Sequence, residues 1–167
     1  MNIHSYFYFG GNKLEIERLS KFKNDDFKKL ANEIYNVSKN IIKDYPNYKE
    51  WYWNVNIPRV INNSGDIFFI RENNKIIALS SLKKTDEYKI CTIYIEKHYR
   101  NKHIGMKLME EITKYFGINN PLITFYEDKY PLFLPFIKKY NWKLTRKVIR
   151  GNKVELYFNE ANKKIQN

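Results

Sequence analysis

The most regular pattern of hydrophobic and polar positions lies between residues 88 and 117. Side chains from residue 90 to residue 95 alternate with the period of a β-strand. One face would carry Ile90, Thr92 and Tyr94, and the other Cys91, Ile93 and Ile95. Because both sets are largely apolar, the alternation predicts a strand covered on both faces. Downstream, Ile104, Leu108, Ile112 and Tyr115 recur at helical spacing, and Gly117 is placed to cap the C-terminus of the helix.

The chain before this unit predicts a strand, two helices and a β-hairpin. Leu14 and Ile16 alternate with glutamates, which indicates a short first strand. A helix capped by Asn24 or Asp25 follows, is ended by Pro46, and carries on one side Phe27, Leu30, Ala31, Ile34 and Ile41. A second helix is predicted over residues 51–55, with Pro58 breaking or restarting it. Residues 66–71 and 75–82 predict two strands joined by Asn73-Asn74, a pair able to adopt the positive φ of a tight hairpin.

The remaining elements are a strand, a helix and a closing hairpin. Pro121 introduces a strand over residues 122–125. A helix then ends near Tyr140, although Pro131 and Pro135 cannot both lie comfortably in its first turn. Residues 142–148 and 154–158 predict a hairpin, and residues 159–167 a polar tail. The predicted order is β-α-α-β-β-β-α-β-α-β-β, in a single domain over residues 1–167 with its core at about 14–158.

A short basic loop, residues 100–105, connects the predicted strand at 88–95 to the following helix. Such a connection presents successive backbone N–H groups, together with the positive end of a helix dipole, to a bound anion. Arg100 and Lys102 add two cationic side chains. The arrangement predicts a site for a phosphate group, and the alternative is an ordinary connection with solvated charges.

At these residues the chain resembles the GNAT superfamily of acyl-CoA-dependent N-acyltransferases. The signature of that superfamily is Arg or Gln, two residues, Gly, one residue, then Gly or Ala, and here the segment runs from Arg100 to Gly105 with His103 at the first Gly position. Residues 136–142 are similar to a second superfamily stretch, Phe-Tyr-Glu-Lys-x-Gly-Phe. The resemblance covers roughly residues 14–158, and its sequence-specific part about 90–142.

The resemblance implies an α/β (α+β) fold with a mixed, mostly antiparallel sheet of about seven strands flanked by about four helices. It implies transfer of acetyl from acetyl-CoA to a primary amine by direct attack. The acceptor stays open among small amines, protein amines and an aminoacyl-tRNA. Two other functions also stay open: a non-catalytic acyl-CoA-binding regulator, and a basic nucleic-acid-binding module.

The resemblance also implies where acetyl-CoA binds. Backbone amides at the helix start would hold the pyrophosphate, and the strand end would pair with the pantetheine arm. Lys139, or its neighbour Lys138, would meet the ribose phosphate. The residues expected to bind the cofactor are Ile93, Tyr94, Ile95, Arg100, Asn101, Lys102, His103, Ile104, Gly105, Met106 and Lys139.

Catalytic and acceptor-binding residues are expected from the same resemblance. Glu87 precedes the strand that leads to the phosphate loop, where some members place a general base. The usual proton donor to the thiolate is a Tyr, but that position is Ile137 here. Tyr130, Tyr126 or Tyr140 is expected to replace it, or the thiolate leaves unassisted. Trp51 and Trp53 occupy the segment that walls the acceptor pocket in similar proteins, and the alternative is that they seal a helix to the sheet.

Composition changes this picture little. The net charge of +12 invites a nucleic-acid partner, but the cations are mostly scattered Lys without an Arg-rich stripe. The single Cys91 excludes an internal disulfide and is expected to be a packed, inert thiol. The three His residues lack zinc-ligand spacing, so no metal is expected. No apolar run reaches membrane-spanning length and residues 1–11 lack the pattern of a secretion signal, so a cytoplasmic location is expected by default.

Overall fold

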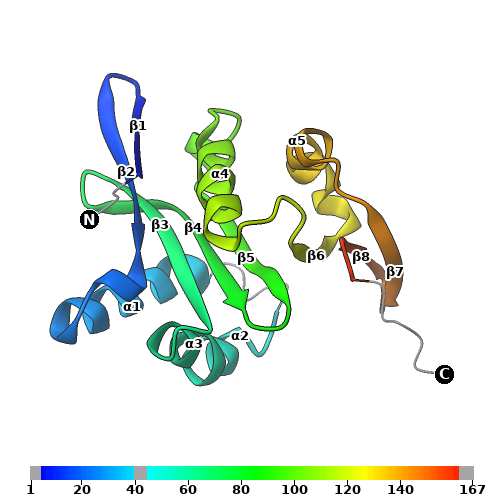
Figure 1. Ribbon diagram of the computed structural model, residues 1–167, viewed down its shortest axis with the longest axis horizontal. Helices are drawn as coiled ribbons and strands as arrows, with labels where there is room; N and C mark the ends of the chain where they lie inside the picture. The colour runs from blue at the N-terminus through cyan, green and yellow to red at the C-terminus, as the bar shows by residue number, and fades with distance from the viewer. Residues whose placement is uncertain (1–4, 40–44, 162–167) are drawn as a thin grey trace.

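The computed structural model describes residues 5–39 and 45–161, which form one eight-stranded sheet with helices on both faces (Figure 1). The strands are β1 (Ser5–Phe9), β2 (Asn12–Arg18), β3 (Gly65–Glu72), β4 (Lys75–Lys84), β5 (Tyr88–Ile95), β6 (Leu122–Tyr126), β7 (Leu144–Arg150) and β8 (Lys153–Phe158). The helices are α1 (Asn24–Ser38), α2 (Tyr48–Trp51), α3 (Ile57–Ile61), α4 (Ile104–Phe116) and α5 (Tyr130–Tyr140). The strand order across the sheet is β1-β2-β3-β4-β5-β6-β8-β7.

Every neighbouring pair of strands is antiparallel except β5 and β6, which run parallel. Helices α4 and α5 pack on one face around a core that includes Leu108 and Phe136, while α1, α2 and α3 pack on the other around Ile34 and Tyr52 (Figure 1). This mixed, mostly antiparallel sheet covered by helices confirms the predicted fold class.

Several predicted local features are confirmed. Asn73 and Asn74 join β3 to β4 with φ of 49° and 62°, so both occupy the left-handed region that a two-residue hairpin requires. Strand β5 has the predicted position, and α4 ends at Gly117, whose φ is 71° and whose N–H donates to Thr113 O at 2.8 Å. Each of these features depends on residues that are neighbours in the chain.

Strand β1 was not predicted and raises the strand count from about seven to eight. It forms a hairpin with β2 at one edge of the sheet, across Gly10 and Gly11 (Figure 1). Phe7 and Phe9 pack against the core, whereas Tyr6 and Tyr8 are exposed. The run of aromatic residues hides the alternation, because phenylalanine and tyrosine differ little in polarity.

The helices of the α1–α3 face differ in detail from the prediction. Lys23, not Asn24 or Asp25, is the N-cap of α1, and it forms no side-chain cap hydrogen bond. Ile41 lies outside the described residues. The second helix runs further than predicted, from Tyr48 to Ile61, with a π-helical turn at residues 52–56. Pro58 restarts the helix as predicted: it lies in the first turn of α3, where a missing N–H is tolerated.

A β-bulge in β5 corrects the predicted faces of that strand. Ser81 pairs with Thr92 and Leu82 with Ile90, so Cys91 is an extra residue between them. The bulge places Ile90 on the same face as Ile93 and Ile95, in the α4–α5 core, although simple alternation assigned it to the opposite face. The strand is also less covered than predicted, since residues 91–95 are only half-buried.

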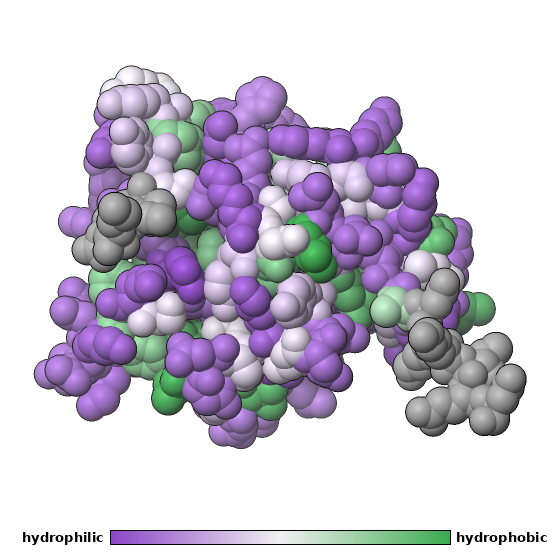
Figure 2. All heavy atoms as spheres, viewed as in Figure 1, coloured by the Kyte–Doolittle hydropathy of each residue, from purple (hydrophilic) through white to green (hydrophobic). Residues whose placement is uncertain are grey.

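The surface shows no large apolar face in the view of Figure 2, where hydrophilic side chains predominate. Within residues 5–39 and 45–161, no helix is both long enough and apolar enough to cross a membrane. The same residues contain no group of three or more His, Cys, Asp or Glu side chains placed to hold a metal ion.

Candidate functional site

The site begins where β5 and β6 separate. These parallel strands pair only through Lys89 with Leu122 and Ile90 with Ile123. Beyond this pairing they diverge, and a cavity of about 650 Å³ lies between them. Its size falls within the range of about 300–1,000 Å³ that is usual for small-molecule sites. The separation turns the last five residues of β5 from the middle of a sheet into one wall of a cavity.

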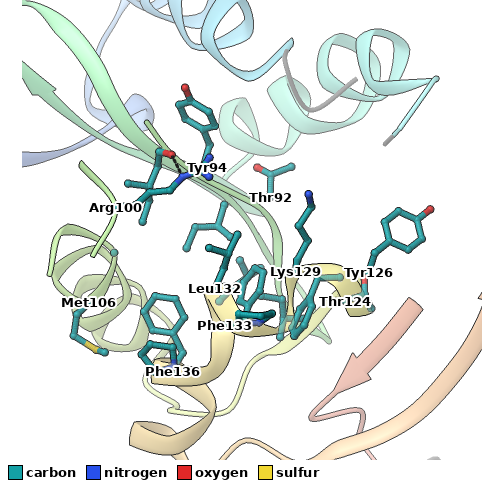
Figure 3. A pocket seen from close by; sticks show the side chains of 18 of the residues that line it. Thr92, Tyr94, Arg100, Met106, Thr124, Tyr126, Lys129, Leu132, Phe133 and Phe136 are labelled. Carbon is teal, nitrogen blue, oxygen red and sulfur yellow. Dashed lines mark hydrogen bonds between the residues drawn. The ribbon is translucent and has the colours of Figure 1, made fainter. Parts of the chain in front are cut away.

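Four segments and Tyr45 line this cavity (Figure 3). Strand β5 contributes residues 90–95 and strand β6 residues 123–126. The connection into α4 and the first turn of that helix contribute Arg100, Asn101, His103, Gly105 and Met106. The connection into α5 and that helix contribute Lys129, Pro131, Leu132, Phe133, Pro135 and Phe136.

The start of α4 forms one end of the cavity and has the geometry expected of an anion-binding site. Asn101 and His103 have φ of 59° and 62°, and the chain reverses through these two left-handed residues into the helix. Lys107 N–H is the first to be satisfied inside the helix, donating to His103 O at 3.0 Å. The preceding amides of the first turn have no intrahelical acceptor and coincide with the positive end of the helix dipole. This geometry suits a phosphate group.

Arg100 and Gly105 position this end of the cavity. Arg100 Nε donates to Ile95 O at 3.0 Å, which ties the loop to the end of β5 (Figure 3). A Cβ on Gly105 would lie 2.6 Å from Ile95 Cδ1 and 3.2 Å from Phe136 Cζ. Glycine therefore allows the helix start to approach both β5 and α5 closely.

The structure brings most of the expected cofactor residues together. Eight of them line the cavity: Ile93, Tyr94, Ile95, Arg100, Asn101, His103, Gly105 and Met106. Lys102 does not line it, because its Nζ lies 5.6 Å from the Phe9 ring centroid, beside the β1–β2 hairpin. The Ile104 side chain is fully buried in the core. Lys139 Nζ donates to Glu110 Oε1 at 2.9 Å, outside the cavity, and this hydrogen bond lowers the pKa of Glu110.

Only one of the expected catalytic and acceptor-binding residues lines the cavity. Tyr126 lines the cavity, whereas Tyr130 is 37% exposed and does not. Glu87 lies just before β5, at the end away from the cavity's anion-binding loop, and pairs with Lys83 at 3.2 Å. Trp51 and Trp53 pack against the α1–α3 core and do not line this cavity.

Sequence reasoning did not single out several other residues that line the cavity, notably Tyr45, Thr92, Thr124, Lys129 and Leu132. Thr124 and Tyr126 share one face of β6, so alternation within that short strand was the available signal. Nothing local indicated that Tyr45 would stack on Tyr126, with ring centroids 6.1 Å apart and planes inclined by 23°. That contact joins segments far apart in the chain.

The charges of the cavity are mainly positive. Its described lining includes Arg100 and Lys129 but no Asp or Glu. Cys91 also lines it, and burial raises the pKa of its thiol, which keeps the thiol protonated near neutral pH. Burial, and then the negative charge of Glu96, raise the pKa of Tyr94, whose ring points away from α4 and α5 in Figure 3. The cavity can therefore accept an anionic ligand along an apolar wall.

Comparisons with known proteins agree with this geometry. The fold is shared with an acetyltransferase of the GNAT family from Staphylococcus aureus Mu50 (20% identity, 86% of this chain and 97% of that one, TM-score 0.53). It is shared with an IAA acetyltransferase from Bacillus cereus (16% identity, 86% of this chain and 97% of that one, TM-score 0.51). It is also shared with a candidate GNAT acetyltransferase from Desulfovibrio desulfuricans (10% identity, 87% of this chain and 96% of that one, TM-score 0.59). A search of curated proteins found no match. The Acetyltransferase (GNAT) family matches residues 24–118, more than half of the chain, and the protein therefore belongs to that family.

Proposed function

We propose that this protein transfers an acetyl group from acetyl-CoA to a primary amine by direct attack of the amine on the thioester. The observation that carries the proposal is the cavity between β5 and β6, which begins at the anion-binding start of α4 and continues along an unpaired strand edge. Membership of the GNAT acetyltransferase family supports it.

Acetyl-CoA would enter with its pyrophosphate against the first-turn amides of α4. Arg100 would supply a positive charge beside them. The departure of His103 from the family glycine does not prevent this, because His103 adopts the left-handed backbone that a glycine would provide. The pantetheine arm is an extended amide chain, and it would hydrogen bond to the free edge of β5 at residues 93–95 as an added strand.

In the chemical step the amine nitrogen forms a bond to the thioester carbon. The carbonyl oxygen becomes an oxyanion, which a backbone amide near the end of β5 would stabilise. The C–S bond then breaks, and the products are the acetylated amine, CoA and a proton. An alkyl ammonium has a pKa near about 10.4, so its proton must be removed first. Since Glu87 lies away from the cavity, we propose that water carries this proton out.

Of the three tyrosines expected as proton donors, Tyr126 lines the cavity, and we propose that it protonates the departing thiolate. A thiol has a pKa of only about 8.5, so this leaving group needs little assistance. Tyr126→Phe is therefore expected to lower kcat by at most about 100-fold, which is the lower end of the usual contribution of a general acid. Unchanged acetyl-CoA binding in this variant would show that the loss is chemical.

The first test is calorimetric titration of the purified protein with acetyl-CoA. The wild type should bind, and Arg100→Ala and Gly105→Glu should weaken or abolish binding. Lys143→Gln is the matched control: Lys143 is an exposed lysine whose Nζ contacts Asn141 Oδ1 at 2.8 Å, away from the cavity. Absence of binding in the wild type would refute the proposal. Binding without turnover on any primary amine would instead indicate a non-catalytic acyl-CoA-binding domain.

A further inference from the structure

One end of the cavity is distinct from the anion-binding start of α4. This second end, which we call the acceptor end, is formed by Tyr45, Thr92, Thr124, Tyr126 and Lys129. It combines two threonine hydroxyls, a pair of stacked tyrosine rings and one ammonium group. Because the phosphates of acetyl-CoA would occupy the α4 end, the acceptor end is left for a second substrate.

Lys129 supplies the positive charge of the acceptor end. It ends the short 3-10 turn that connects β6 to α5, and Figure 3 shows its side chain projecting into the open region that Thr92 and Tyr126 border. Its ion pair is with its neighbour Asp128, at 3.5 Å, and the Asp128 side chain is 60% exposed. An exposed pair of this kind contributes little and is readily exchanged for a better anion.

The charges around Lys129 do not neutralise it strongly. Glu127 pairs with Lys147 at 3.1 Å, and Glu155 pairs with Arg150 at 3.1 Å. Lys153 also lies nearby, with its Nζ 4.8 Å from the centroid of the Tyr126 ring. Among the described residues that line the cavity there is no carboxylate that would attract a second cationic group of a polyamine. The electrostatics therefore favour an acceptor with a negative charge.

The aromatic pair defines a second property of the acceptor. Tyr45 and Tyr126 stack at the rim of the cavity, and Leu132, which is 49% exposed, lies on the same cavity wall. Such surfaces bind flat or apolar groups by stacking and burial.

We infer that the acceptor is a primary amine that carries an anionic group, a carboxylate or a phosphate, close to the amine, and that Lys129 binds this group. An aromatic amino acid has the amine, the nearby anionic group and a flat apolar ring, whereas a polyamine carries only positive charges. The inference rests on the proposed acetyl transfer and narrows its substrate class. Binding of the anion by Lys129 would orient the amine toward the thioester held along β5.

The test compares matched amines by kcat/KM for acetyl transfer. Phenylalanine is compared with phenylalaninamide, and O-phosphoethanolamine with ethanolamine, so that the two pairs separate a carboxylate from a phosphate. Spermidine serves as the cationic amine. The members of a pair differ in amine pKa, so their kcat/KM values are not compared directly. The readout is the ratio of kcat/KM for the amine with the anionic group to kcat/KM for its matched amine without it, and the change in this ratio between the wild type and Lys129→Gln. Removing a charge-assisted hydrogen bond should lower the ratio for the preferred pair about tenfold.

Two further variants and one binding measurement make the result specific. Lys129→Arg should retain the wild-type ratio, as should Lys143→Gln. The affinity for acetyl-CoA should be unchanged in Lys129→Gln. Three outcomes would overturn this inference and leave the proposed acetyl transfer standing: an unchanged kcat/KM ratio in Lys129→Gln, a preference of the wild type for spermidine, or a weaker affinity of Lys129→Gln for acetyl-CoA. A wild type that acetylates no amine at all would overturn the proposed function and this inference together.

Discussion

The backbone of His103 offers a quantitative test of the loop that precedes α4. His103 has φ of 62° and ψ of 2°, which lies in the left-handed region. For a residue with a Cβ this conformation costs about 1–2 kcal/mol relative to the right-handed one, whereas glycine adopts it freely. The GNAT motif that this loop resembles has glycine at this position. We therefore expect His103→Gly to stabilise the protein.

The size of the effect follows from two opposing terms. Relief of the left-handed conformation contributes about 1–2 kcal/mol to the free energy of unfolding. The greater freedom of glycine in the unfolded chain removes about 0.5–1 kcal/mol. The midpoints of these two ranges give a net gain of about 0.75 kcal/mol, which corresponds to a rise in Tm of about 1.5–3 °C for a chain of this size.

Urea unfolding, followed by the fluorescence of the three tryptophans, measures this gain, and thermal unfolding checks it. His103→Ala is the control for the side chain: alanine keeps a Cβ, so the strain remains and no comparable gain is expected. Asn101→Gly should gain less, because asparagine tolerates the left-handed region at φ of 59°. An equal gain from His103→Ala, or a loss from His103→Gly, would refute the reasoning.

Three further predictions concern other parts of the molecule. Asp66→Ala should lower the free energy of unfolding by about 3 kcal/mol in urea, because this buried carboxylate accepts from Arg18 Nε at 2.9 Å and from three other donors; a loss below about 1 kcal/mol would contradict this. Burial raises the pKa of Tyr48 to about 12 from 10.0, so the contribution of this group to the free energy of unfolding is full below pH 10 and is lost as pH rises toward 12. Between pH 10 and pH 12 the free energy of unfolding of Tyr48→Phe should therefore fall by about 2 kcal/mol less than that of the wild type. Parallel profiles of unfolding free energy against pH would contradict this. Cys91→Ala should retain acetyl transfer, because burial raises the pKa of this thiol and disfavours the thiolate; an inactive variant that still binds acetyl-CoA would instead indicate an acyl-cysteine intermediate.

The parts of the fold that the sequence predicted are those with local causes. The hairpin at Asn73-Asn74 follows from two residues that tolerate positive φ, and the end of α4 from Gly117. The same holds for the proposed anion-binding loop, since residues 100–105 are contiguous and its expected chemistry resides in backbone amides. These features could be located before any strand was paired with another.

The faces of β5 could not be predicted in this way. Simple alternation separated Ile90 from Ile93, whereas the extra residue at Cys91 brings them to the same face. A bulge is a property of two paired strands, here β4 and β5, so no pattern within one strand reveals it. The side chains of Lys102 and Lys139 illustrate the same limit. Both were expected at the cofactor site, but partners distant in the chain, Phe9 and Glu110, hold them outside the cavity.

By itself, the sequence determined the order of most elements, the GNAT resemblance and the position of the turn that we propose binds phosphate. Only the tertiary structure decided that β5 and β6 separate after two residue pairs, and that Tyr45, Tyr126 and Lys129 meet at one end of the resulting cavity. The reason is physical. Turns and helix ends are set by the conformational preferences of adjacent residues, whereas a cavity is formed by segments distant in the chain, whose positions depend on how all the strands and helices pack.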